Sequence, residues 1–202
     1  MKLYFAPGAC SLSPHIVLRE AGVPVELKKV DLGSKAIEGG GNFTAINAKG
    51  YVPVLELPNG DVLTEGPAIV QYIADQNPDS NLAPKNGTIE RYRLQEWLNF
   101  ITSELHKNFG ALFNKNISDD WKSAVLANIS KRLNFVVDKL KGKQYLLGDQ
   151  FSVADAYLFT VLGWGKHVGV DIGNWPALTE YVGRVSARPK VQEALRAEGL
   201  LK

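Results

Sequence analysis

Cysteine and histidine are scarce in this sequence of 202 residues, which contains one cysteine, Cys10, and three histidines. A single thiol cannot form an internal disulfide, and three scattered histidines without a second thiol make a poor zinc-binding set. We therefore expect neither a metal site nor a tightly bound cofactor. A reducing compartment, the cytoplasm, fits this cysteine usage best.

Long apolar runs and blocks of like charge are also missing. The apolar N-terminus is interrupted by Pro7 and Gly8, which leaves no stretch long enough for a signal peptide or a membrane span. The 23 basic and 21 acidic residues are scattered along the chain and give a net charge of +2 at pH 7. Neither a membrane nor a nucleic acid is therefore an expected partner. The hydrophobic fraction of 45% is typical of a folded protein, and the length permits two domains.

Residues 1–77 change their hydrophobic period every ten to fifteen residues, which is typical of an α/β domain. Ser13 is predicted to cap the first helix, with Pro14 at its first position. Asn59 and Gly60 are predicted to supply the two positive-φ positions of a tight hairpin turn. The expected order is β-α-β-α-β-β-α, with elements at 3–5, 14–21, 25–30, 43–46, 52–57, 62–64 and 66–76.

The rest of the chain shows a linker and then only helical patterns. Residues 78–86 have the proline-rich, polar composition of a linker, and residues 87–202 form the expected all-helical domain. A capping box at Ser152 and Asp155 opens one of its helices. The helices are expected at 89–109, 121–140, 153–166, 177–187 and 189–197.

Cys10 follows the first predicted strand and precedes the predicted Ser13 cap by three residues. A helix N-terminus lowers the pKa of a nearby thiol, which favours a reactive thiolate at neutral pH. A free cysteine can equally be a small, inert buried residue. Position alone leaves both interpretations open.

Two further segments suit a ligand that resembles an amino acid or a peptide. At Glu65-Gly66-Pro67, helix N–H groups beside a carboxylate can bind a zwitterion, although helix capping also explains these residues. At Val52-Pro53, a cis bond would expose the Val52 main chain at a strand edge. The chemistry of X–Pro bonds alone favours trans.

The helix expected over residues 89–109 carries an apolar and a polar stripe. The apolar stripe comprises Leu94, Leu98, Ile101 and Leu105. The polar stripe comprises Asn99, Ser103 and His106, with Glu104 close to its edge. Such a polar stripe is either a solvated face or one wall of a site.

Over essentially its whole length the chain resembles a bacterial glutathione S-transferase of the beta class. The motifs that carry the resemblance are residues 2–11 (KLYFAPGACS), Val52-Pro53, 63–69 (LTEGPAI), 104–107 (ELHK) and 151–157 (FSVADAY). The resemblance implies a thioredoxin-like domain over 1–77 and an all-helical domain over 87–202. It also implies a homodimer, with the electrophile pocket and dimer contacts in the helical domain.

The resemblance also implies roles for individual residues. Val52-Pro53 is the expected cis step, and the Val52 main chain pairs with the cysteinyl unit of glutathione. Glu65 and Gly66 hold the γ-glutamyl end, and Lys35 faces the glycyl carboxylate. The catalytic residues are Cys10, which lies close to the glutathione sulfur, and His106, which faces the same region. Asn99, Ser103 and Glu104 line the cleft. The electrophile pocket is expected in the helical domain near Phe109, Phe113, Trp164 and His167, and the sequence leaves open which of these reach it.

The predicted function is that of a detoxifying enzyme that conjugates reduced glutathione, its co-substrate, to small hydrophobic electrophiles. Thiol-disulfide exchange through Cys10 is expected beside conjugation. The alternatives are a non-catalytic binding or regulatory protein on the same fold, and a glutathione-dependent dehalogenase or isomerase, since a fold does not determine function.

Overall fold

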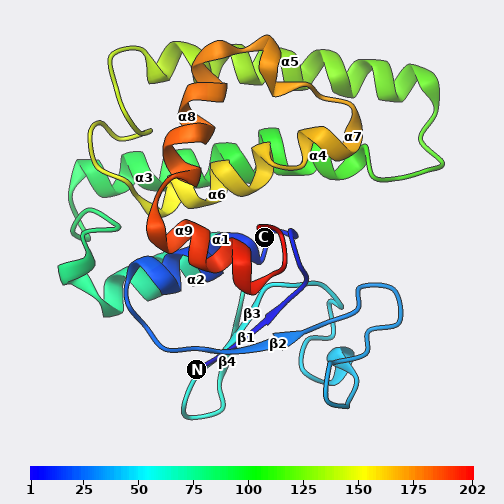
Figure 1. Cartoon of the computed structure of the whole chain (residues 1–202), viewed down its shortest axis with the longest axis vertical. Coiled ribbons are helices and arrows are strands. Elements are labelled where there is room, and N and C mark those ends of the chain that lie inside the picture. Colours follow the sequence, from blue (N-terminus) through cyan, green and yellow to red (C-terminus); the bar gives the residue numbers. More distant parts are fainter. The chain divides into compact units, whose positions relative to one another are not determined.

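The structure is a computed structural model that describes residues 1–202 (Figure 1). It contains two compact units. Residues 1–83 together with 187–202 form unit 1, and residues 84–186 form unit 2. The division between residues 83 and 84 falls inside the expected linker. No helix combines the length and the apolar character needed to cross a bilayer, and no group of three or more potential metal ligands is present.

Unit 1 contains a four-stranded mixed sheet in the order β2-β1-β3-β4. Strand β1 pairs in parallel with β2 and antiparallel with β3, and β3 pairs antiparallel with β4. Helices α1, α2 and α9 lie on one side of the sheet in Figure 1, where α1 contacts both of the others. The elements are β1 Lys2–Phe5, α1 Leu12–Glu20, β2 Glu26–Lys29, η1 Phe43–Ala45, β3 Val54–Glu56, β4 Val62–Thr64, α2 Gly66–Gln76, η2 Pro78–Ser80 and α9 Pro189–Ala197.

The two central strands supply the core of the sheet, because Leu3, Val54 and Leu55 are fully buried. The chain leaves this core at Phe5, so the loop that follows β1 emerges at the C-terminal end of a central strand. Cys10 is carried by this loop.

The helix start predicted at Ser13 and Pro14 is wrong by two residues. Helix α1 begins at Leu12, and Ser13 is buried in its first turn, where its hydroxyl has no hydrogen-bond partner. The N-cap position belongs to Ser11, whose hydroxyl accepts from the N–H of Ala6 at 3.1 Å and donates to the carbonyl of Ala6 at 3.2 Å. The helix starts earlier because Ser11 closes the loop of residues 6–11.

The hairpin is confirmed, but its predicted turn is wrong. Of the two turn residues only Gly60 has a positive φ, of 89°. The connection is wider than two residues, since the N–H of Leu57 donates to the carbonyl of Asp61 at 2.8 Å. The Asn59 side chain accepts from the N–H of Asp61 at 3.1 Å and stabilises this wider loop.

Residues 187–202 belong to unit 1, whereas the sequence analysis placed all of 87–202 in the helical domain. Helix α9 packs on α1. Arg188 forms a two-pronged ion pair with Glu20, with N–O distances of 2.7 and 2.8 Å. Contacts between residues far apart in the sequence, such as Arg188 and Glu20, therefore place α9 in unit 1.

The end of α9 also holds the loop that precedes Cys10. Glu198 and His15 are both buried, and the Nδ1 of His15 lies 2.8 Å from one oxygen of the Glu198 carboxylate. The other oxygen accepts from the N–H of Gly8 at 2.9 Å. His15 is thus a structural residue of unit 1.

Unit 2 is entirely helical, which together with the sheet of unit 1 confirms the predicted fold class. The helix expected over 89–109 contains a π-helical segment, η3, and the one expected over 153–166 breaks after Leu162. Helix α6 is buried along its whole length. The elements are α3 Ile89–Phe100, η3 Ile101–His106, α4 Lys107–Ala111, α5 Asp119–Leu140, α6 Val153–Leu162, α7 Gly165–Val168, η4 Ile172–Asn174 and α8 Pro176–Ser186.

Candidate functional site

Cys10 lies against the main chain of Val52 in unit 1. Cys10 is half-buried, and its thiol donates a hydrogen bond to the Val52 carbonyl, with 3.2 Å between sulfur and oxygen. The Val52–Pro53 bond is cis, which confirms what the family resemblance implied. The general preference of X–Pro bonds for trans gave the wrong answer here. The thiol therefore lies against the main chain just before the start of β3.

Of the two interpretations of Cys10 that the sequence left open, the structure favours the protonated thiol over the thiolate. Burial raises the pKa of the Cys10 thiol from its ordinary value of 9.0 to about 11. Hydrogen bonds from the backbone N–H groups of Cys10 and Ser11 lower this pKa, and the nearby charge of Glu65 raises it further. Loss of water around the sulfur outweighs the N-terminus of α1, and the carbonyl acceptor also favours the protonated thiol.

The hydroxyls of Ser11 and Tyr4 bond to partners other than Cys10. Both hydrogen-bonding roles of the Ser11 hydroxyl are taken by the main chain of Ala6. The Tyr4 hydroxyl donates to the Glu56 carboxylate at 2.7 Å. In this structure the hydrogen-bond partner of the Cys10 thiol is thus the Val52 carbonyl and not a neighbouring hydroxyl.

Glu65 and Gly66 begin α2, but the Glu65 side chain does not cap the helix. Its carboxylate instead accepts hydrogen bonds from the Lys49 ammonium at 2.5 Å and from the Tyr51 hydroxyl at 3.1 Å. A Cβ added at Gly66 would meet only Pro53, at 3.9 Å, so the first N–H groups of α2 are open to a close approach. The Glu65 carboxylate is therefore positioned by Lys49 and Tyr51 and takes no part in capping the helix.

Lys35 lies in the irregular segment that follows β2 and has a φ of 61°. A Cβ added at Gly50 would lie 3.7 Å from the Lys35 Cε, which shows that the lysine stem passes over Gly50. Gly50 precedes Tyr51 and Val52, so Lys35 brings a positive charge close to the cis-proline loop. Sequence reasoning missed Lys49 and Tyr51, which no local pattern marks.

The second set of candidate residues lies in unit 2, on α3 and η3. The apolar stripe of Leu94, Leu98, Ile101 and Leu105 is confirmed, since all four side chains are buried. Within η3 the N–H of Lys107 reaches back to the carbonyl of Thr102, an i→i−5 bond that widens the helix at this point. Such π segments are frequent at functional sites.

Asn99 and Ser103 form an exposed pair on this helix, and the Ser103 hydroxyl donates to the Asn99 carbonyl at 3.1 Å. Glu104 forms an ion pair with Arg132 of α5 at 2.6 Å. The Glu104 carboxylate is therefore held by a helix that the sequence analysis did not connect to it.

His106 is held by two aromatic residues. Its Nδ1 lies 2.6 Å from the hydroxyl of Tyr157, and its ring meets Trp164 edge to face, with 4.8 Å between ring centroids. Tyr157 was not predicted as a site residue. The signal that could have found it is its place in the apolar helix α6, where a buried hydroxyl needs an internal partner.

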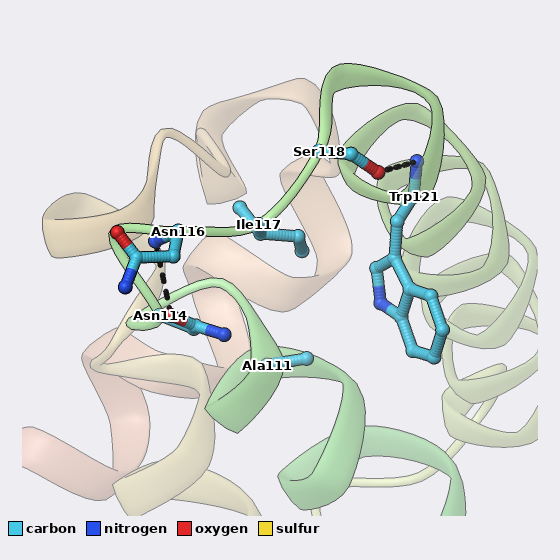
Figure 2. A pocket seen from close by; sticks show the side chains of 6 residues that line it. All are labelled: Ala111, Asn114, Asn116, Ile117, Ser118 and Trp121. Carbon is cyan, nitrogen blue, oxygen red and sulfur yellow. Dashed lines mark hydrogen bonds between the residues drawn. The ribbon is translucent and has the colours of Figure 1, made fainter.

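A hollow of about 360 Å³ lies where α4 leads into α5 (Figure 2). It is lined by Ala111, Asn114, Asn116, Ile117, Ser118 and Trp121. None of the four residues expected to line an electrophile pocket borders it. Among these four, Phe109 is a core residue with no exposed surface, Trp164 is 8% exposed, and Phe113 is 51% exposed.

Together, the mixed sheet, the cysteine loop, the cis proline and the helical unit define a thioredoxin-like thiol protein with an added helical domain. The chain matches the family description "Glutathione S-transferase, N-terminal domain" over residues 8–76 and "Glutathione S-transferase, C-terminal domain" over residues 100–189. It therefore belongs to the glutathione S-transferase family, and it is a catalytic member rather than a binding protein on the same fold.

Full-length relatives support this assignment. Glutathione S-transferase GstA of Escherichia coli O157:H7 is 46% identical over 99% of this chain and 100% of that protein. BphK, a bacterial glutathione S-transferase solved as a ternary complex, is 59% identical in sequence to this chain. The match covers 99% of this chain and 100% of the BphK chain, with a TM-score of 0.97. The beta-class enzyme of Sphingomonas chungbukensis is 49% identical, with full coverage of both chains and a TM-score of 0.95. The predicted resemblance to bacterial beta-class enzymes is confirmed.

Proposed function

We propose that this chain is a beta-class glutathione transferase that transfers the sulfur of reduced glutathione to small hydrophobic electrophiles and exchanges disulfides through Cys10. The observation that carries the proposal is the 3.2 Å contact between the Cys10 sulfur and the Val52 carbonyl, beside a cis proline. Main-chain groups at the end of a strand can pair with a peptide-like ligand. Glutathione combines such a peptide with the thiol that Cys10 would meet.

In unit 1 each part of glutathione has a suitable partner. The ammonium of the γ-glutamyl end is assigned to Glu65, and its carboxylate to the open N–H groups that begin α2 at Gly66. The cysteinyl unit pairs with the main chain of Val52, next to Pro53. The glycyl carboxylate is assigned to Lys35.

We also propose that four residues of unit 2 contact glutathione, in part across a homodimer: Asn99, Ser103, Glu104 and His106. His106 would orient the glutathione sulfur. The homodimer is supported by an apolar surface on α3 and α5, where Phe135, 41% exposed, packs on the rings of Trp97 and Phe100. Surfaces of this kind often mark protein contacts. We also propose a detoxifying role in the cytoplasm, with no tightly bound cofactor.

Two reactions follow from the chemistry of the thiols. In conjugation, the glutathione thiolate attacks the electrophile, and the protonated Cys10 stabilises that thiolate by a hydrogen bond. In exchange, the Cys10 thiolate attacks the disulfide between glutathione and another thiol, forms a Cys10–glutathione disulfide and releases the other thiolate. Reduced glutathione then attacks this mixed disulfide, which restores Cys10 and releases oxidised glutathione.

The Cys10→Ala variant tests the covalent step. After incubation with oxidised glutathione, the wild type is expected to gain one glutathione adduct by intact-protein mass spectrometry, and the variant none. Cys10 is the only cysteine, so no other thiol can carry the adduct. Calorimetric titration with reduced glutathione should show binding to both proteins. An adduct on the variant would remove Cys10 from the covalent role, and a titration of the wild type without heat would refute the proposed function.

The Glu65→Gln variant tests recognition of the ammonium. We expect its affinity for glutathione to fall about tenfold, because a hydrogen bond to a charged group contributes roughly 1.5–3 kcal/mol. A glutathione analogue without the α-amino group should bind the wild type and the variant equally. The matched control is Glu56→Gln, since Glu56 also pairs with a lysine and a tyrosine but has no assigned ligand. Equal losses for both ligands would contradict the assignment.

A further inference from the structure

Glu65 already holds an ammonium group that belongs to the chain itself. The Nζ of Lys49 donates to Oε1 of Glu65 at 2.5 Å and to the Oγ1 of Thr64 at 3.1 Å. The Tyr51 hydroxyl donates to the same Glu65 oxygen at 3.1 Å, and the Lys49 Nζ lies 5.7 Å from the centre of the Tyr51 ring. A carboxylate, a hydroxyl and an aromatic ring thus surround the Lys49 ammonium.

The pair between Lys49 and Glu65 is open to exchange with another cation. The Lys49 side chain is 45% exposed and that of Glu65 54% exposed, so water reaches both charged groups. Ion pairs between such half-exposed side chains contribute little to stability, because water solvates the separated charges almost as well. Breaking this pair therefore costs little, and the flexible lysine stem can move the ammonium into water.

The α-ammonium of a γ-glutamyl group has the same chemistry as the Lys49 ammonium. Each is a compact cation with three N–H donors and one positive charge. Two such cations within reach of one carboxylate repel each other, and the single negative charge of Glu65 balances only one of them. The two ammonium groups therefore compete for Glu65.

We infer that Lys49 competes with the ligand: its ammonium occupies Glu65, and a γ-glutamyl ammonium displaces it on binding. The inference rests on the proposed function, which assigns the ligand ammonium to Glu65. Lys49 thereby lowers the affinity for glutathione. It also affects ligand selectivity, since a ligand without an ammonium leaves the pair of Lys49 and Glu65 intact.

The Lys49→Met variant tests the competition because it removes the charge and keeps an unbranched side chain. We expect it to bind reduced glutathione about threefold more tightly than the wild type in calorimetry, since no ion pair has to be broken first. A glutathione analogue without the α-amino group should not bind more tightly to the variant. In a Glu65→Gln background, Lys49→Met should also give no gain in affinity for glutathione.

The matched control is Lys2→Met. Lys2 also donates to a glutamate that accepts from a tyrosine hydroxyl, but this glutamate, Glu56, has no assigned ligand. The control substitution should leave the affinity for glutathione unchanged. Glutathione carries two carboxylates and one ammonium at neutral pH, so the loss of a lysine charge alone weakens binding. Tighter binding by Lys49→Met therefore reports the displacement of Lys49.

Chemical labelling of the wild type gives a second readout that needs no substitution. The hydrogen bond to Glu65 raises the pKa of the Lys49 ammonium, so release from Glu65 increases the fraction of reactive neutral amine. Lysines are acetylated with a trace of reagent, with and without S-methylglutathione, and quantified by mass spectrometry. Lys28, which pairs with Glu26 at 2.6 Å, is the internal reference. The ratio of Lys49 to Lys28 labelling should rise with S-methylglutathione and stay constant with its analogue that lacks the α-amino group.

Equal or weaker binding of glutathione by Lys49→Met, or a labelling ratio that does not rise, would overturn the inference. Lys49 would then stay on Glu65 or bind the ligand itself. Failure of the proposed function gives a different result, because the wild type then produces no heat with glutathione. If only the inference fails, the wild type binds glutathione and the effect of Lys49 alone is missing.

Discussion

Alkylation of Cys10 by iodoacetamide is expected to accelerate about 1,000-fold between pH 7 and pH 10. The pKa of the thiol is raised to about 11, so the protein holds the neutral form throughout this range. Below the pKa each pH unit increases the thiolate population about tenfold. A thiol with the ordinary pKa of 9.0 gains only about 90-fold over the same range and then approaches a plateau. The measurement is the alkylation rate against pH, read by mass spectrometry.

The slope with pH, rather than the absolute rate, is the decisive quantity. Partial burial slows attack at every pH, and a thiolate of higher pKa is intrinsically more nucleophilic, so absolute rates combine several effects. Free glutathione measured in parallel is the control, and circular dichroism verifies that the fold persists at pH 10. A rate that is already constant above pH 7 would show that the N-terminus of α1 dominates over burial and that Cys10 is a thiolate at neutral pH.

This behaviour assigns different pH ranges to the two proposed reactions. At neutral pH Cys10 is a hydrogen-bond donor, which suits stabilisation of a glutathione thiolate during conjugation. Exchange needs the Cys10 thiolate, so its rate should rise with pH until another step becomes limiting. The ratio of exchange to conjugation is therefore expected to increase from pH 7 to pH 9.

The sequence pattern predicts the elements of unit 1 well because their signals are local. The alternation over 25–30 and the proline after Gly66 each depend on neighbouring residues. The start of α1 was predicted two residues too late, at Ser13 and Pro14. The earlier start accompanies the closure of the Ser11 hydroxyl on Ala6, which is a contact of the folded loop and leaves no local sequence signal.

The candidate site shows the same limit for its chemistry. The sequence places Cys10 at a helix N-terminus, but it does not show how much water the folded loop excludes from the sulfur. The partners of other site residues come from distant segments: Tyr157 lies 51 positions beyond His106, and Arg132 belongs to a different helix from Glu104. Family resemblance predicts the residues, whereas the packing of unit 2 determines what holds them.

Asp155 makes more contacts than its local sequence pattern, a helix capping box, predicts. The capping box predicted at Ser152 and Asp155 is present, and the Asp155 carboxylate accepts from the N–H of Ser152 at 2.9 Å and from its hydroxyl at 2.7 Å. It also accepts from the N–H of Leu146 and from the hydroxyl of Tyr181, both at 2.9 Å. A fully buried carboxylate thus joins the loop before α6 to α8.

The Asp155→Ala variant is expected to lose at least about 3 kcal/mol of unfolding free energy, because a buried donor left without a partner costs roughly 1–3 kcal/mol and this substitution orphans several. Ser152→Ala is the matched control and should lose about 0.5–2 kcal/mol, the usual cost of a lost N-cap. Urea titration followed by tryptophan fluorescence and circular dichroism measures both values. If the two variants were equally destabilised, Asp155 would act only as a helix cap, and its contacts with Leu146 and Tyr181 would contribute nothing to stability.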